Sequence, residues 1–198
     1  MKGLGTLRAI LSLASSMLVS TGGWAAEIPG ESDDPYADES PAGRNARMAW
    51  WREARFGIFI HWGVYAVPAG VWKPSGITGG GEWLMHGAKI PVDAYKALAQ
   101  EFNPTKYDPE MWAQLALDSG AGYVVITAKH HDGFALYDSE VSDFNTVDAT
   151  PFERDVIAEL YDACPRHGVR FGVYYSHGLD WRDGGIQGLR LPGADEEQ

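Results

Sequence analysis

The 198-residue chain has a single cysteine and few basic residues for its number of acids. One cysteine, Cys164, cannot form an internal disulfide, so a scaffold held together by disulfides is excluded. We expect this thiol to be buried and structural rather than nucleophilic, because free cysteine is among the most buried residue types. Sixteen lysine and arginine residues against 27 acids give a formal net charge of −11. That charge would repel nucleic acid and favours neutral ligands.

Long hydrophobic runs are also absent, except at the amino terminus. Lys2 and Arg8 precede the apolar stretch 9–19, and Gly23-Trp24-Ala25 offers small residues at the positions that a signal peptidase reads. The stretch is shorter than the ~20 residues of a membrane-spanning helix, so an uncleaved anchor is the weaker alternative. We predict a signal peptide at 1–25, cleaved after Ala25, no membrane span after cleavage, and a secreted or periplasmic protein.

The rest of the chain divides by composition. Residues 26–45 are rich in Pro, Gly, Ser and acids, which predicts a flexible linker, and 182–198 form a Gly-rich acidic tail. Between them, proline and Asx start signals predict helices beginning at Pro91, at Asp108-Pro109 and at Pro151. The last of these helices is expected to close at His167-Gly168.

Three apolar runs, at 58–62, 124–131 and 171–175, read as buried strands because β-branched and aromatic residues continue without a polar face. Their alternation with helices predicts a parallel α/β fold of the βα-barrel type. The polar residues that end the three runs would then lie on one rim, where such barrels build their sites.

Histidines end the first two of these strands. His61 follows one run, and His130 and His131 follow another. Neighbouring residues of a regular strand point to opposite faces, so both imidazoles of the pair reach one cavity only if the strand breaks there, and Asp132-Gly133 supplies a break.

Two chemistries could use these imidazoles. A metal site is the first, but no spacing typical of zinc or non-haem iron ligands is present. Sugar recognition is the second, since a neutral imidazole can both donate to and accept from hydroxyls while aromatic rings cover a pyranose. The residue types favour the sugar, and neither a metal ion nor another cofactor is expected.

Five ordered motifs strongly resemble the amino-terminal part of family 29 glycoside hydrolases, the α-L-fucosidases. The resemblance extends from about Met48 to Trp181 and is carried by the segments 51–63, 82–83, 102–104, 128–134 and 171–176. Within them the runs Ile60-His61-Trp62-Gly63 and Lys129-His130-His131-Asp132-Gly133-Phe134 are the most specific.

The resemblance implies an α-L-fucosidase-type hydrolase of fucosylated glycans on a (β/α)8 TIM-type barrel, with 46–181 as the amino-terminal part of its catalytic domain. Carried over position by position, it implies a fucose pocket lined by six residues: His61, Glu82, Trp83, His130, His131 and Tyr174. Trp83 would cover the ring, and the histidines and Tyr174 would hold hydroxyls. For Glu82 a solvated loop role is an equal alternative. For Asp180, which also matches family members, a structural loop role is favoured.

Family members are similar to other retaining glycosidases in using two carboxyl groups, and the family's nucleophile follows a fourth strand. We find three strands and no residue matching that nucleophile. The expectation is therefore a barrel truncated to about its first three βα units and inactive alone. The alternatives are a non-catalytic fucose-binding or carbohydrate-binding fragment and, less favoured, a metal-dependent hydrolase.

Overall fold

The computed structural model describes residues 35–72, 76–77 and 80–182. The predicted signal peptide, the first part of the predicted linker and nearly all of the predicted tail lie outside these ranges. Two units are distinguished, one up to Arg44 and one from Asn45 onward. Helix α1 (Pro41–Arg47), which has no buried residue, overlaps the end of the predicted linker. Regular backbone therefore begins earlier than the composition indicated.

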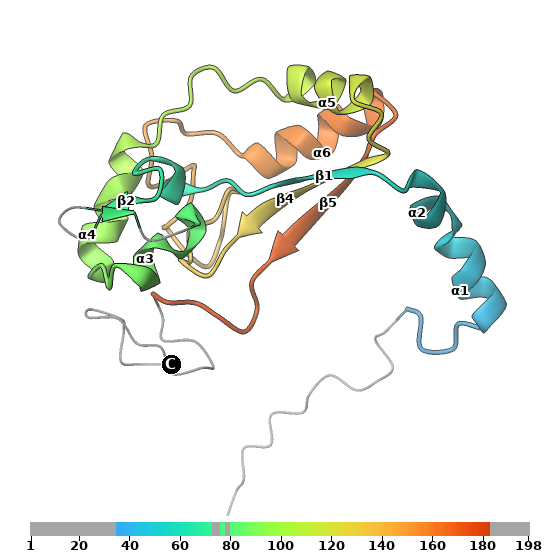
Figure 1. Ribbon diagram of the computed structural model, residues 1–198, viewed down its shortest axis with the longest axis horizontal. Coiled ribbons are helices and arrows are strands. Elements are labelled where there is room, and N and C mark those ends of the chain that lie inside the picture. The colour runs from blue at the N-terminus through green and yellow to red at the C-terminus, as the bar shows by residue number, and fades with distance from the viewer. Residues whose placement is uncertain (1–34, 73–75, 78–79, 183–198) are drawn as a thin grey trace, which may run out of the picture. The chain divides into compact units, whose positions relative to one another are not determined.

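A parallel three-stranded sheet forms the centre of the second unit (Figure 1). It consists of β1 (Gly57–Ile60), β4 (Tyr123–Lys129) and β5 (Arg170–Tyr175), in the order β1-β4-β5. Ile58 is level with Val124 and Phe171, so the three strands run in register. The predicted strands and their parallel pairing are confirmed, within a residue or two at their ends.

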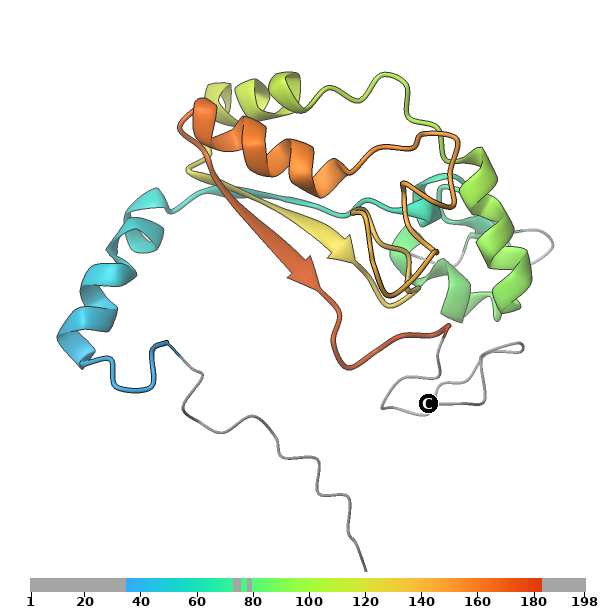
Figure 2. The same cartoon turned by 180° about the vertical axis from the view of Figure 1, so that it is seen from behind.

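Two helices cover one face of this sheet. Both α5 (Pro109–Asp118) and α6 (Val156–Arg166) lie on the same side of the strands in the two opposite views (Figures 1 and 2). Each helix joins one strand to its parallel neighbour, as the alternating pattern predicted. Cys164 lies on α6 and is fully buried, which confirms the expectation of a buried thiol.

Shorter elements gather at the carboxyl ends of the strands. They follow β1 along the chain and fill the long connection to α5. The elements are η2 (Val64–Ala66), β2 (Val71–Trp72) paired with β3 (Gly76–Ile77), η3 (Gly81–Trp83), α3 (Leu84–Gly87), α4 (Val92–Lys96) and η4 (Ala97–Glu101). Helix α2 (Ala49–Ala54) precedes β1 along the chain. The helix predicted from Pro91 is thus one α-helical stretch that tightens into a 3-10 turn.

The sheet has two unlike faces. Residues at alternating positions, such as Ile58, Val124 and Ile126, turn toward α5 and α6, and the two β4 side chains are almost fully buried there. Phe59 belongs to the other face and is 50% exposed. The helix-covered face therefore provides the core, and the opposite face stays open among the described residues.

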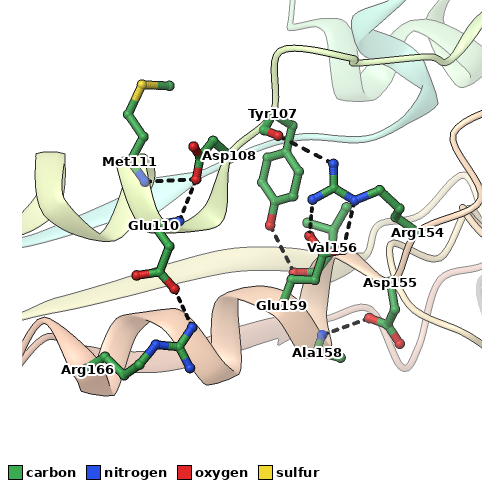
Figure 3. A network of polar contacts seen from close by, with 10 residues as sticks. All are labelled: Tyr107, Asp108, Glu110, Met111, Arg154, Asp155, Val156, Ala158, Glu159 and Arg166. Carbon is green, nitrogen blue, oxygen red and sulfur yellow. Dashed lines mark hydrogen bonds and ion pairs between the residues drawn. The ribbon is translucent and has the colours of Figure 1, made fainter.

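Polar contacts fix α5 against α6, and others join the loop between β4 and α6 to the first turns of α6 (Figure 3). Asp108 caps α5 by accepting hydrogen bonds from Glu110 N (2.9 Å) and Met111 N (3.2 Å). Glu110 forms an ion pair with Arg166 across the two helices. The arginine of the loop, Arg154, binds both carboxylate oxygens of Glu159 at 2.8 and 2.6 Å. The predicted start of α5 at Asp108-Pro109 is confirmed.

The predicted start of the last helix at Pro151 is wrong. Helix α6 begins at Val156, after Asp155, whose side chain accepts from Ala158 N at 2.7 Å. Glu153 has a positive φ of 51°, which breaks any helix before that point. Proline suits a first helical turn, but here it begins a separate turn, and the Asx cap sets the helix start.

Within the described residues, we find no helix that is long and apolar enough to cross a membrane.

Replacing Asp108 by alanine should lower the free energy of unfolding by about 1 kcal/mol, because the first turn of α5 loses its side-chain acceptor. Urea unfolding followed by tryptophan fluorescence measures the change. Asp143→Ala, at an exposed loop acid, is the control and should shift the value by less than about 0.5 kcal/mol. Equal effects of the two substitutions would contradict the capping role.

Candidate functional site

The three strand ends bring the predicted imidazole and phenol side chains together. The ring centroids of His61 and His130 are 5.7 Å apart, those of His130 and Tyr174 are 5.6 Å apart, and those of His130 and His131 are 4.2 Å apart. Phe59, on the open face of the sheet, stacks on His61, and their ring centroids are 4.7 Å apart. The in-register parallel pairing is the cause, because it places the carboxyl ends of all three strands at one edge.

A tight turn after β4 lets adjacent histidines face one site. The strand ends at Lys129, and Gly133 N donates to His130 O at 3.1 Å. Gly133 has φ +78°, and a Cβ atom there would lie 2.7 Å from Asp180 Oδ1, so any other residue would be strained and would displace the Asp180 side chain. The break predicted at Asp132-Gly133 is therefore present.

Asp132 anchors this turn from the protein interior. It is 1% exposed, and its Oδ2 accepts from Tyr95 Oη at 2.8 Å while its Oδ1 accepts from Phe134 N at 3.2 Å. Burial raises the pKa of Asp132 to about 7, against the lowering effect of these two donors. Tyr95 comes from α4, so the carboxyl group ties that helix to the histidine turn.

A second contact joins the ends of β1 and β4. Thr127 is 1% exposed and its Oγ1 donates to Trp62 O at 2.8 Å while accepting from Trp62 N at 3.0 Å. Tyr65 Oη lies 3.2 Å from the same oxygen. Because Trp62 follows His61 directly, these bonds fix the backbone beside the first histidine.

Trp83 approaches from the loop between β1 and α4. It lies in η3, is 43% exposed, and its ring centroid is 5.4 Å from His131 and 5.3 Å from Trp181. Glu82 is the neighbouring residue and is half-buried. Burial raises the pKa of Tyr65, against the lowering effect of the hydrogen bond to Thr127, and the charges of Asp132 and Glu82 raise it further. The structure thus brings five of the six predicted residues into one chain of ring contacts, with Glu82 next to it.

The environment of His130 and His131 favours their neutral forms. Burial lowers the pKa of His130 to about 4, and the nearby His131 and His61 add to the shift. Burial also lowers the pKa of His131, with a further contribution from the Lys129 charge. A neutral imidazole offers one donor and one acceptor, which suits hydroxyl groups.

One atom of the site lacks a partner. The side chain of His130 is almost fully buried, and its Nδ1 has no hydrogen-bond partner among the described residues. Buried polar atoms are nearly always paired, so such an atom calls for an explanation. A ligand hydroxyl at this point would supply the missing bond.

A hollow of about 260 Å³ lies at the end of β5, and of the six predicted residues only His131 and Tyr174 line it. Its lining joins His131 to the strand end and the loop that follows: Tyr174, Tyr175, Ser176, His177, Gly178 and Leu179. The volume is on the small side of the ~300 to 1,000 Å³ typical of ligand pockets, as suits a single sugar ring.

The loop after β5 contributes residues that sequence reasoning did not assign to the site. Asp180 Oδ2 pairs with Lys129 Nζ at 2.6 Å, and Trp181 N donates to His131 O at 2.7 Å. Ser176 Oγ lies 2.7 Å from His131 Nδ1. These residues lie inside or just after the motifs that match the family, which is the signal that the sequence offered for them. Their partners are 45 to 51 residues away along the chain, so only the fold reveals these contacts.

No group of three or more His, Cys, Asp or Glu side chains in the described ranges is arranged so that it could hold a metal ion.

Comparison with known proteins places this arrangement in a family. The sequence profile of the family described as Alpha-L-fucosidase matches residues 28–192. The tissue alpha-L-fucosidase of Rattus norvegicus is 38% identical over 160 residues, which cover 73% of this chain and 31% of that protein. The chain therefore spans about a third of the length of the curated relatives it matches.

Solved structures of alpha-L-fucosidases are also similar to this chain. The alpha-L-fucosidase AlfC of Lactobacillus casei, in complex with alpha-L-fucose product, is 44% identical with a TM-score of 0.69, over 71% of this chain and 43% of that one. A variant of AlfC in complex with Fuca(1,6)GlcNAc gives 44% identity and a TM-score of 0.68, over 71% of this chain and 44% of that one.

His130 should remain neutral in the folded chain until the pH approaches about 4, because its pKa is lowered there by burial. Between about pH 6.5, the ordinary value, and pH 4 the unfolded chain gains this proton and the folded chain does not. The contribution of His130 to stability therefore falls as the pH falls through this window. A ¹³C NMR titration of the imidazole carbons measures its pKa, and a midpoint near 6.5 in the folded chain would contradict the buried, neutral site.

Removing the hydroxyl of Tyr95 should destabilise the chain by about 1 to 3 kcal/mol, because Tyr95→Phe leaves a buried carboxyl oxygen of Asp132 without its donor. Urea unfolding measures the loss. Tyr161→Phe removes a hydroxyl from a side chain that is 66% exposed and should leave stability nearly unchanged. If both variants unfolded at the same urea concentration, the anchoring of the turn by Tyr95 would be disproved.

Proposed function

Since the chain belongs to the alpha-L-fucosidase family, we propose that its pocket holds the fucosyl residue of a terminal α-L-fucoside for retaining hydrolysis. The observation that carries the proposal is the unpartnered Nδ1 of His130, a buried side chain surrounded by aromatic and imidazole rings. A sugar hydroxyl would satisfy that nitrogen, and a charged ligand would gain little there.

Each predicted residue then has a role. His61, His130, His131 and Tyr174 hydrogen-bond hydroxyls, since each carries groups able to donate or accept. Trp83, with 43% of its surface exposed beside His131, covers the apolar C–H face of the ring. Glu82, adjoining Trp83, is the carboxylate that we propose as a candidate for a part in the reaction.

We further propose that the three-stranded sheet is the first part of a (β/α)8 barrel. Apolar side chains are exposed where further barrel strands and helices would cover them: Phe59 and Val173 are each 50% exposed, and Leu115 on α5 is 64% exposed. This chain matches only 31% of the length of the rat relative, which supports the same proposal.

Catalysis needs more than these substrate-holding residues. Retaining glycosidases use two carboxyl groups ~5 to 5.5 Å apart, one as nucleophile and one as acid/base. Asp132 and Asp180 are engaged with Tyr95 and Lys129. We therefore propose that these 198 residues supply the substrate-holding side of the site and that at least the nucleophile belongs to the part of the relatives that the chain does not match.

The natural ligand is proposed to be a fucosylated glycan or glycoconjugate, of the kind present in the AlfC complex with Fuca(1,6)GlcNAc. We also propose a secreted or periplasmic location, which rests on the signal-peptide pattern at 1–25.

The chain should bind L-fucose and should not bind its mirror image D-fucose, measured by saturation-transfer NMR on the full 198 residues. His130→Ala should weaken binding about tenfold, because one buried hydrogen bond to the sugar is lost. Aryl α-L-fucoside should bind without release of the aryl group.

The control is His167→Ala. His167 lies at the end of α6, beside Glu110 and at the opposite end of the strands, and its loss should leave binding unchanged. Equal binding of both fucose enantiomers, or equal effects of His130→Ala and His167→Ala, would overturn the assignment. Turnover abolished by Asp180→Ala would make that residue a nucleophile and would overturn the proposed division of roles.

A further inference from the structure

The bonds around Ser176 determine where His131 carries its proton. Ser176 is 4% exposed, and its Oγ makes two short contacts, to Leu179 O at 2.6 Å and to His131 Nδ1 at 2.7 Å. A carbonyl oxygen can only accept, so the single hydroxyl hydrogen points at Leu179. The contact to Nδ1 therefore requires a hydrogen on the imidazole nitrogen, because two lone pairs at 2.7 Å would repel one another.

The other ring nitrogen is then an acceptor. In a neutral imidazole only one nitrogen carries hydrogen, and the hydrogen bond made by one nitrogen sets the state of the other. With Nδ1 protonated, His131 Nε2 presents a lone pair. The neighbouring Lys129 ammonium, held by Asp180 at 2.6 Å, opposes protonation of the ring to imidazolium.

Backbone contacts hold the ring in this position. Ser176 N donates to Lys129 O at 3.0 Å, which continues the β4–β5 pairing beyond the strands, and Trp181 N donates to His131 O at 2.7 Å. Both ends of the loop 176–181 are thereby fastened to the histidine turn. The hydroxyl of Ser176 has little freedom to turn its hydrogen elsewhere.

We propose that Ser176 is a positioning residue that locks His131 in the Nδ1–H tautomer, so that Nε2 accepts a hydrogen bond from a ligand hydroxyl. The identity of the ligand rests on the function proposed above. The consequence for specificity is that the sugar must donate at this point. An analogue carrying a group that accepts but cannot donate there leaves Nε2 facing another electron-rich atom.

The tautomer can be measured without a ligand, on the whole 198-residue chain labelled with ¹⁵N. Long-range ¹H–¹⁵N spectra distinguish a protonated from a bare ring nitrogen, and the His131→Gln variant assigns the signals. We expect a protonated Nδ1 and a bare Nε2 in His131. A protonated Nε2 would overturn the proposal, whether or not the chain binds fucose.

Variants test whether Ser176 is the cause. Ser176→Ala removes the acceptor and should move the Nε2 signal toward the protonated form, whereas Ser176→Thr keeps a hydroxyl and should retain the bare Nε2. Ser119→Ala is the matched control, since Ser119 also donates to a carbonyl, at the far end of α5, and should change nothing at His131. An unchanged tautomer in Ser176→Ala would overturn the role of the serine. If that variant does not fold, the unsubstituted chain and Ser176→Thr decide.

Fluorinated sugars test the consequence. Replacing one ring hydroxyl of L-fucose at a time by fluorine removes the donor at nearly constant size. One member of the series should bind about tenfold more weakly and should leave the His131 Nε2 signal unmoved, whereas L-fucose shifts it. Binding of every member as tight as that of L-fucose would overturn the acceptor role. Failure of L-fucose itself to bind would refute the proposed function and leave the ligand-free tautomer result standing.

Discussion

The turn that ends β4 is the constraint on which the site depends. A continuing strand would send His130 and His131 to opposite faces of the sheet, and one imidazole would be lost to the site. The hydrogen bond from Gly133 N to His130 O bends the chain, and the two ring centroids come within 4.2 Å. Asp132, fully buried and bound by Tyr95, holds this bend from inside the protein. The same residue therefore serves the core and the site.

The neutral state of His130 and His131 follows from the same packing. Burial lowers the pKa of His130 to about 4 and lowers that of His131, so uncharged imidazoles persist where a charged ring would have to lose its water. The positive charge of Lys129 lies at the same edge and is paired with Asp180, with both side chains less than a fifth exposed. Uncharged donors and acceptors suit a neutral sugar, in agreement with the overall acidity of the chain.

Much of the fold could be predicted from local sequence. The apolar runs gave three parallel strands, and Asp108-Pro109 gave the start of α5, because each depends on residues close together in the chain. The start of α6 could not be predicted in the same way. Pro151 and Asp155 both carry start signals, and the choice between them depends on turn contacts around Thr150 and on the positive φ of Glu153.

The sequence by itself determined the residue types of the site and its family, since long ordered motifs need no geometry to be matched. It also determined that the polar strand ends share one rim, because parallel strands in register leave no other choice. Only the tertiary structure decided which residues hold the imidazoles. Ser176 lies 45 residues from His131, and Asp180 lies 51 residues from Lys129. Hydrogen bonds across such separations arise only after the strands have paired, so no local pattern encodes them.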